Sequence, residues 1–136
     1  MQPIKIFTTG GTIDKVYFDA KSTYEVGEPN ISRVLAELPL DLDYAVTSIL
    51  QKDSLEITPA DRNLVVAAVQ DAEEQHIIVT HGTDTMVDTA KALHEVAGDK
   101  TIVLTGALEP ALFKTSDAMF NIGCAIAAVQ ALGPGA

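Results

Sequence analysis

The 136-residue chain carries 9 lysine and arginine residues against 19 aspartate and glutamate residues, a formal net charge of −10. Nucleic acids and anionic membrane surfaces attract basic proteins, so this balance argues against both as partners. A hydrophobic content of 47% suits one globular domain. No signal peptide is recognisable and no apolar run approaches the roughly 20 residues of a membrane span, so we expect a cytoplasmic protein.

Short apolar segments typical of buried strands alternate with helical segments along the chain. The predicted strands are about 5–8, 43–49, 76–80 and 101–105, and the predicted helices are about 31–38, 59–73, 84–97 and 115–132. The second helix has a strong start signal, with Thr58 as cap and Pro59 as first residue. Strict alternation predicts a three-layer α/β/α fold, flavodoxin- or Rossmann-like, with a mainly parallel four-stranded sheet in the order 2-1-3-4. We expect these strands to be buried on both faces.

Two turns rich in threonine and glycine each follow a predicted strand. They read Thr8-Thr9-Gly10-Gly11-Thr12 and Thr80-His81-Gly82-Thr83-Asp84-Thr85. Parallel sheets bind ligands outside the carboxyl ends of their strands, so the two turns are predicted to face each other across one site. Gly11 and Gly82 are expected to let the backbone approach the ligand closely.

Residues 10–29 form a connection that is long for an α/β unit, and such loops are commonly lids. The segment contains Tyr17, Phe18 and Tyr24 and ends in a turn-like Val-Gly-Glu-Pro sequence. We expect a mobile, hairpin-like flap over the site. A disordered surface loop is the alternative interpretation.

The two turns resemble the signature motifs of bacterial-type L-asparaginases, at residues 6–13 (IFTTGGTI) and 79–86 (VTHGTDTM). Three further matches occur in the family's order: Tyr24-Glu25-Val26-Gly27, Asp53-Ser54 with Thr58-Pro59, and residues 104–110 with Ser116-Asp117-Ala118 and Phe120-Asn121. The resemblance covers about residues 4–125 and implies an enzyme that hydrolyses the side-chain amide of L-asparagine or a related compound.

Carried over position by position, the resemblance implies that Thr12 is the nucleophile and that Tyr24, on the flap, is its partner. It implies Thr83 as the second catalytic hydroxyl, Asp84 as the ligand of the substrate's amino group, and Ser54 as the ligand of its α-carboxylate. A threonine hydroxyl needs a neighbouring group to take its proton, and backbone N–H groups at turns stabilise a developing oxyanion.

Each of these residues also has an ordinary structural explanation. Thr12 and Thr83 could be turn hydroxyls bonded to the backbone, Asp84 could cap the third helix, and Tyr24 could be surface packing. His81 is expected to be an orienting or structural residue rather than the base. Cys124, the single cysteine, excludes an intrachain disulfide and is expected to pack in the core from the last helix.

The sequence also departs from the family pattern. We expect one domain over residues 1–136 with the second asparaginase domain absent, and the chain ends before the position of the family's catalytic lysine. Lys114, in the loop after the fourth strand, is predicted to replace that lysine, and Lys15, on the flap, is the second candidate. Leu55 takes a polar family position and is expected to alter substrate contacts. We expect a homodimer or higher homo-oligomer in which a neighbouring copy closes the site.

Three classes of function remain open at this point. The first is a small amidohydrolase, and the second is a non-catalytic binder of amino acids or amides that keeps the pocket without the proton relay. The third is a phosphate or flavin binder, because hydroxyl-rich turns also hold phosphates in flavodoxin-like sheets. The third class lacks a Gly-Lys-Ser/Thr sequence and an aromatic pair for a flavin. We therefore predict no cofactor and no metal.

Overall fold

The structure, a computed structural model, describes residues 2–136. Its centre is a parallel four-stranded sheet in the order β4-β1-β5-β6. The bounds of these strands are β1 Ile4–Gly10, β4 Tyr44–Lys52, β5 His76–Thr80 and β6 Thr101–Thr105. Four helices cover the sheet: α1 Ile31–Glu37, α2 Pro59–Asp71, α3 Met86–Val96 and α4 Ala118–Ala131. The four predicted strands correspond, in chain order, to β1, β4, β5 and β6, so the predicted order 2-1-3-4 is confirmed. This order makes β1 and β5 neighbours at the centre of the sheet.

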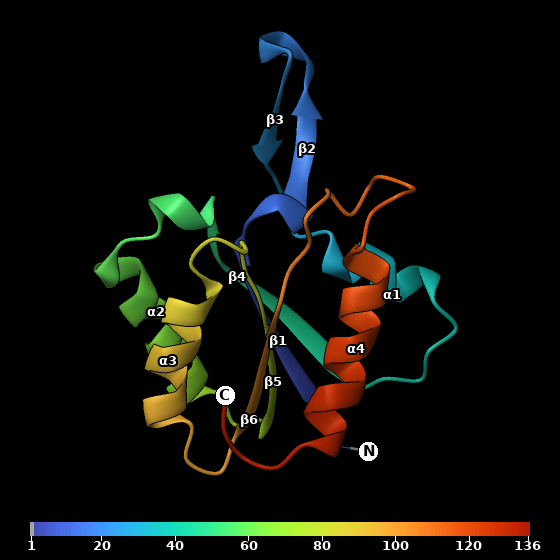
Figure 1. Cartoon of the computed structure of the whole chain (residues 1–136). Coiled ribbons are helices and arrows are strands. Elements are labelled where there is room, and N and C mark those ends of the chain that lie inside the picture. The colour runs from blue at the N-terminus through green and yellow to red at the C-terminus, as the bar shows by residue number, and fades with distance from the viewer. Residues whose placement is uncertain (1) are drawn as a thin grey trace.

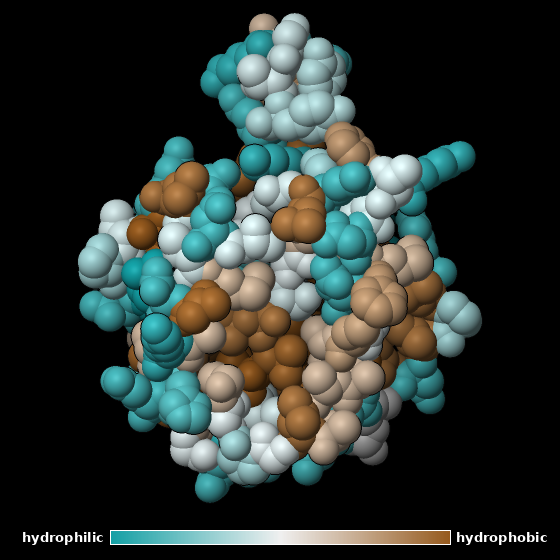
Figure 2. Space-filling view, in the orientation of Figure 1, coloured by the Kyte–Doolittle hydropathy of each residue, from teal (hydrophilic) through white to brown (hydrophobic). Residues whose placement is uncertain are grey.

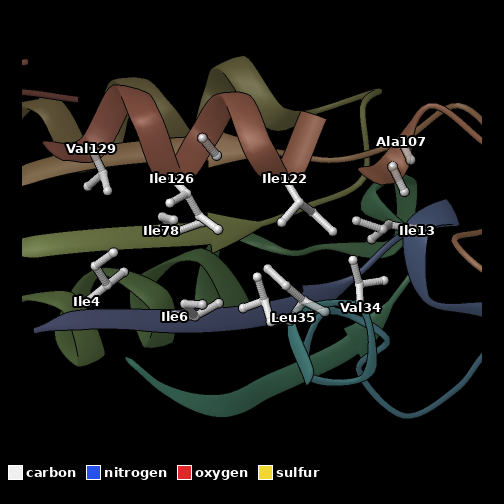
Figure 3. Close-up of a cluster of buried hydrophobic side chains, with 13 residues drawn as sticks. Ile4, Ile6, Ile13, Val34, Leu35, Ile78, Ala107, Ile122, Ile126 and Val129 are labelled. Carbon is white, nitrogen blue, oxygen red and sulfur yellow. The ribbon is translucent and has the colours of Figure 1, made fainter. Parts of the chain in front are cut away.

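The two faces of the sheet carry separate hydrophobic clusters because side chains alternate along each strand. Ile4 and Ile6 of β1 pack with Ile78 of β5 under α1 and α4 (Figure 3). Phe7, pointing to the opposite face, packs with the cluster under α2 and α3. Figure 1 shows the resulting three layers, with α2 and α3 on one side of the sheet and α1 and α4 on the other. The three-layer α/β prediction is therefore confirmed.

Two predictions about burial are wrong. Burial on both faces holds for β1 and β5, and no residue of β6 is exposed, but β4 is an edge strand whose Thr47 and Ser48 are exposed. Cys124 is exposed rather than buried, because it lies on the side of α4 that borders the edge strand β6 and lines a shallow hollow there with Leu104. The sheet-facing side of that helix is formed by residues such as Ile122 and Val129.

The helix boundaries follow local hydrogen bonds. Thr58 and Asp61 form a capping box at the start of α2, as the sequence signal predicts. The last helix begins at Ala118, three residues later than predicted. The reason is the carboxylate of Asp117, which accepts hydrogen bonds from the backbone N–H groups of Leu108 and Glu109 and so holds residues 107–117 as an ordered loop.

The long connection after β1 is a β-hairpin, which confirms the predicted hairpin-like shape of the flap. It consists of β2 Lys15–Phe18 and β3 Thr23–Val26, paired antiparallel. The hairpin projects beyond the carboxyl ends of the sheet strands (Figure 1). Among residues 2–136, no helix is long and apolar enough to span a membrane.

Candidate functional site

The two Thr/Gly turns touch each other at Gly11 and Gly82. A Cβ atom on Gly11 would lie 2.5 Å from the backbone nitrogen of Gly82, so no larger residue fits there without a shift of the backbone. Gly11 also has a φ of +84°, which L side chains rarely adopt. A second link is the hydroxyl of Thr9, which donates to the carbonyl of Thr80 at 2.8 Å. The structure therefore brings the two turns together, as predicted.

Ser54 joins the same group from the end of β4. A Cβ atom on Gly82 would lie 2.7 Å from Ser54 Oγ, so the serine packs directly on the second turn. Ser54 Oγ accepts a hydrogen bond from the backbone N–H of Thr85 at 3.3 Å, and the Thr85 hydroxyl donates to the Ser54 carbonyl at 2.9 Å. Ser54 is 1% exposed, so its hydroxyl is held against the second turn.

Thr12 begins a short 3-10 turn, η1 Thr12–Asp14, directly after Gly11. Ile13 anchors this turn because its side chain is fully buried in the cluster under α1 and α4. Its carbonyl also accepts a hydrogen bond from the backbone N–H of Ala111, in the loop after β6. Thr12 itself is half-buried, beside the contact between Gly11 and Gly82.

Thr83 and Asp84 follow Gly82 and are both exposed. The prediction that Asp84 caps the third helix is wrong. The helix α3 begins at Met86 with Thr85 at the N-cap position, and no side chain caps it. The carboxylate of Asp84 makes no hydrogen bond or ion pair with residues 2–136, so it is available to a cationic group at the surface of the site.

His81 is buried below the second turn and has two hydrogen-bond partners. Its Nδ1 lies 2.7 Å from the carbonyl of Gly82, and its Nε2 lies 2.8 Å from Thr89 Oγ1. A carbonyl only accepts, so Nδ1 carries the proton and Nε2 accepts from the Thr89 hydroxyl. Arg62 Nε donates to the same Thr89 oxygen at 3.0 Å. Burial lowers the pKa of His81, with the nearby Arg62 charge acting in the same direction, so the neutral imidazole orients the second turn.

Tyr24, on the hairpin, is exposed and packs on two aromatic rings. Its ring centroid lies 5.3 Å from that of Tyr17 across the hairpin and 5.4 Å from that of Phe113, in an edge-to-face arrangement. Phe113 belongs to the loop after β6, so the hairpin contacts that loop. No hydrogen bond within the described chain joins the Tyr24 hydroxyl to Thr12.

The other side of the hairpin contacts the end of β4. Lys15 Nζ lies 3.5 Å from the carboxylate of Asp53, the residue before Ser54. A cavity of about 380 Å³ lies between the two segments and is lined by Lys15, Tyr24, Glu25, Val26, Gln51, Asp53 and Glu56. Its lining is polar and includes three carboxylates and one ammonium group.

Asp14 joins the two ends of the hairpin and is 2% exposed. Its Oδ1 accepts from the backbone N–H of Asn30 at 2.9 Å, and its carbonyl accepts from the N–H of Gly27 at 2.9 Å. Burial raises the pKa of Asp14 to about 6, and the hydrogen bond from Asn30 only partly offsets that rise. The predictions from sequence missed this residue, because nothing in the local pattern distinguishes a buried aspartate from a surface one.

Two further predicted positions lie at the surface. Lys114 is exposed and makes no ion pair or hydrogen bond with residues 2–136, and Leu55 is 74% exposed. Sequence reasoning also overlooked Thr85 as the link to Ser54 and Phe113 as the partner of the hairpin. Thr85 is the third threonine of the second turn, so the sequence contains a signal for it. The position of Phe113, by contrast, depends on how the loop around Asp117 folds.

The chemistry available here is that of hydroxyl and carboxylate groups around exposed turns. Thr12 and Thr83 present hydroxyls, Asp84 presents a free carboxylate, and the turns present backbone N–H groups. No group of three or more His, Cys, Asp or Glu side chains within residues 2–136 could hold a metal ion. The fold and the site together define an α/β protein with a candidate ligand site at the carboxyl ends of β1, β4 and β5.

Comparison with known proteins places the chain in one family. A family model described as "Asparaginase, N-terminal" matches residues 3–136. The chain belongs to the asparaginase family and corresponds to its N-terminal domain.

The relatives are named as enzymes acting on asparagine or glutamine. The chain is 32% identical over 146 residues to L-asparaginase 2-3 of Saccharomyces cerevisiae. This match covers 97% of the present chain and 40% of the relative. It is 29% identical over 136 residues to the glutaminase-asparaginase of Pseudomonas fluorescens biotype A, covering 91% of this chain and 37% of that protein.

Two solved structures have the same fold. The thermostable L-asparaginase from Thermococcus kodakarensis superposes with a TM-score of 0.86 at 29% identity, over 98% of this chain and 42% of the other. The probable cytoplasmic L-asparaginase from Campylobacter jejuni superposes with a TM-score of 0.82 at 29% identity, over 95% of this chain and 42% of the other. The chain therefore spans about two fifths of the length of the relatives it matches.

Proposed function

We propose that this protein is an amidohydrolase that converts the side-chain amide of L-asparagine, or of a related compound, to the acid and ammonia. The observation that carries the proposal is the convergence of Gly11, Gly82 and Ser54 at the carboxyl ends of three strands. In this proposal Thr12 and Thr83 act from the two turns that carry Gly11 and Gly82, and Asp84 acts as a free carboxylate. Membership of the asparaginase family, with relatives named as L-asparaginases, supports the same reaction.

The reaction proceeds in two steps on Thr12. The Thr12 hydroxyl oxygen attacks the amide carbon while its proton passes to a base, and backbone N–H groups of the turns stabilise the oxyanion. The C–N bond then breaks, the nitrogen takes a proton and leaves as ammonia, and an ester remains on Thr12. Water attacks that ester, with Thr83 as the second hydroxyl, and releases the acid.

Substrate binding in this proposal uses charges that complement a zwitterionic amino acid. The exposed carboxylate of Asp84 binds the α-ammonium group. Ser54 binds the α-carboxylate from the neighbouring turn. Tyr24 reaches the site from the hairpin as the partner of Thr12.

The proposed proton acceptor is a lysine that lies outside the two Thr/Gly turns. Lys114 stays the predicted base, supported by its place next to Phe113, which contacts Tyr24. Because Lys114 is exposed, this role requires that bound substrate covers its ammonium group. Lys15 is less suited, because it already pairs with Asp53.

A second function, non-catalytic binding of an amino acid or amide, is favoured by one observation. The hydroxyls of Thr12 and Thr83 make no hydrogen bond to any group in residues 2–136 that could accept a proton. The test is ammonia release from L-asparagine, with calorimetric titration of the same compound in parallel. Turnover supports the enzyme, and binding without turnover supports the binder. The absence of both turnover and binding would contradict an asparagine site.

The proposal extends to the location and assembly of the protein. We propose a cytoplasmic protein, in line with the relative from Campylobacter jejuni, which is named as a probable cytoplasmic L-asparaginase. We also propose a homodimer or higher homo-oligomer, because α4 carries no charged residue and exposes Met119 and Phe120, with Leu132 exposed directly after it. Figure 2 shows apolar surface on this helix and along the neighbouring sheet edge. Such a surface is typical of an interface.

A further inference from the structure

Lys15 and Asp53 form the one ion pair within residues 2–136 that connects the hairpin to the sheet. Lys15 is the first residue of β2, and Asp53 directly follows β4. Lys15 Nζ and Asp53 Oδ2 are 3.5 Å apart, and their side chains are 28% and 34% exposed. The pair therefore lies at the foot of the hairpin, partly shielded from water.

Asp53 is fixed on the turn that carries Ser54. Its Oδ1 accepts from the backbone N–H of Leu55 at 3.2 Å, so this carboxylate caps the short 3-10 turn η3, Ser54–Glu56. Ser54 is in turn bonded to Thr85 of the second Thr/Gly turn. The Lys15–Asp53 ion pair therefore connects the hairpin to the turn of Ser54, the residue proposed to bind the α-carboxylate of the substrate.

The ring of Tyr24 holds the hairpin against Phe113, in the loop after β6. The hairpin thus makes one charged and one aromatic contact with other segments of the chain. The 380 Å³ cavity has both Lys15 and Tyr24 in its lining. Loss of either contact weakens the attachment of the hairpin.

We propose that Lys15 is a positioning residue: its ion pair with Asp53 ties the hairpin to the Ser54 turn and so keeps Tyr24 docked against Phe113. The inference rests on the proposed function for its consequence in catalysis, although the docking itself is measurable without turnover. Lys15 touches no reacting group and acts through Tyr24. Partly exposed ion pairs contribute little, so removing this one should change the docked-to-released ratio by about two- to fivefold.

The experiment observes Tyr24 directly. The protein is labelled with fluorotyrosine at its three tyrosines, and the ¹⁹F signals are assigned with Tyr→Phe variants. Phe113→Ala, which removes the aromatic partner, gives the signal of undocked Tyr24. Lys15→Met should shift the Tyr24 signal toward this reference, and Lys15→Arg should leave the signal at the wild-type position. About 0.5 M salt should shift the Tyr24 signal of the wild type in the same direction as Lys15→Met.

Lys21→Met is the matched control. Lys21 pairs with Glu25 at 3.3 Å, but both residues belong to the hairpin, so this variant removes one positive charge without cutting the tie to the sheet. Its Tyr24 signal should stay at the wild-type position. An unchanged signal in Lys15→Met, or an equal shift in Lys21→Met, would overturn the proposal.

Kinetics separate this inference from the proposed function. If the wild type hydrolyses asparagine, Lys15→Met should raise KM about two- to fivefold, with a smaller effect on kcat, and Lys21→Met should not. If the wild type has no activity, the proposed function fails, and the fluorine measurement still decides whether Lys15 holds the hairpin. A shifted fluorine signal with an unchanged KM would show that Lys15 holds the hairpin but that this contact does not affect catalysis.

Discussion

His81 and Thr89 are joined by a buried hydrogen bond of 2.8 Å between Nε2 and Oγ1, which connects the second Thr/Gly turn to the helix that follows it. Through Thr89 the imidazole also reaches Arg62 on α2. On its other side the imidazole donates to the carbonyl of Gly82, the residue that contacts both Gly11 and Ser54. The position of the second turn therefore depends on three side chains that lie below the site.

The first prediction is that Thr89→Val destabilises the fold by about 1–3 kcal/mol, the cost of leaving a buried polar atom without a partner. Valine keeps the shape of the side chain but offers no hydroxyl to His81 Nε2. The measurement is denaturant unfolding, with Thr23→Val on the exposed hairpin as control. A free energy of unfolding within about 0.5 kcal/mol of the wild type would show that the hydrogen bond does not matter for stability.

The second prediction concerns Asp14 and pH. Its pKa is raised from 3.8 to about 6 in the folded protein, so the folded state binds the proton more tightly than the unfolded state. The stabilising contribution of the protonated carboxyl is complete below about pH 4 and is lost as the pH rises through 6, by about 3 kcal/mol in total. Asp14→Asn is neutral throughout and should not lose this contribution.

The measurement is the free energy of unfolding of both proteins between about pH 4 and pH 7. As the pH rises across this range, the free energy of unfolding of the wild type should fall relative to that of Asp14→Asn. Asp19→Asn, at an exposed aspartate of the hairpin, is the control and should follow the wild type. Parallel pH curves for wild type and Asp14→Asn would contradict a buried, titrating Asp14.

The third prediction tests the nucleophile. Thr12→Val keeps the shape of the side chain and removes the hydroxyl, so substrate binding should largely survive while ammonia release disappears. Calorimetry measures the first quantity and an ammonia assay the second. Thr83→Val should also reduce the rate severely. Wild-type turnover in Thr12→Val would show that the nucleophile is another residue and that the resemblance extends only to the fold.

The fourth prediction tests Lys114 as the base. If its ammonium group replaces the family's catalytic lysine, Lys114→Met should lower kcat about 100-fold or more, the usual contribution of a general base. Stability should change by less than about 0.5 kcal/mol, because the residue is exposed. Lys91→Met, at an exposed lysine of α3, is the control. An unchanged kcat in Lys114→Met would remove Lys114 from the catalytic machinery.

The fifth prediction concerns assembly. Light scattering at micromolar concentration should show a species of at least twice the chain mass of 14.4 kDa. Phe120 is 75% exposed on α4, so Phe120→Glu should shift the protein toward the monomer by placing a charge in the apolar interface. A wild type found only at 14.4 kDa would contradict the proposed oligomer.

Much of this protein was determined by the sequence through short-range patterns. The alternation of strands and helices predicts the sheet order, the capping box at Thr58 predicts the start of α2, and the two Thr/Gly turns predict a meeting at one edge of the sheet. These features depend on residues a few positions apart or on the general geometry of parallel sheets. For that reason they can be deduced without coordinates.

Only the tertiary structure decided which side chains are buried, paired or free. The sequence offered Asp84 as a helix cap and Cys124 as a core residue, yet the fold exposes both, because α3 begins two residues later and Cys124 borders the open edge at β6. The bond between His81 and Thr89, the burial of Asp14 and the ion pair of Lys15 with Asp53 join separate segments of the chain. Their energies depend on desolvation and distance in the packed molecule, which no local pattern of residues contains.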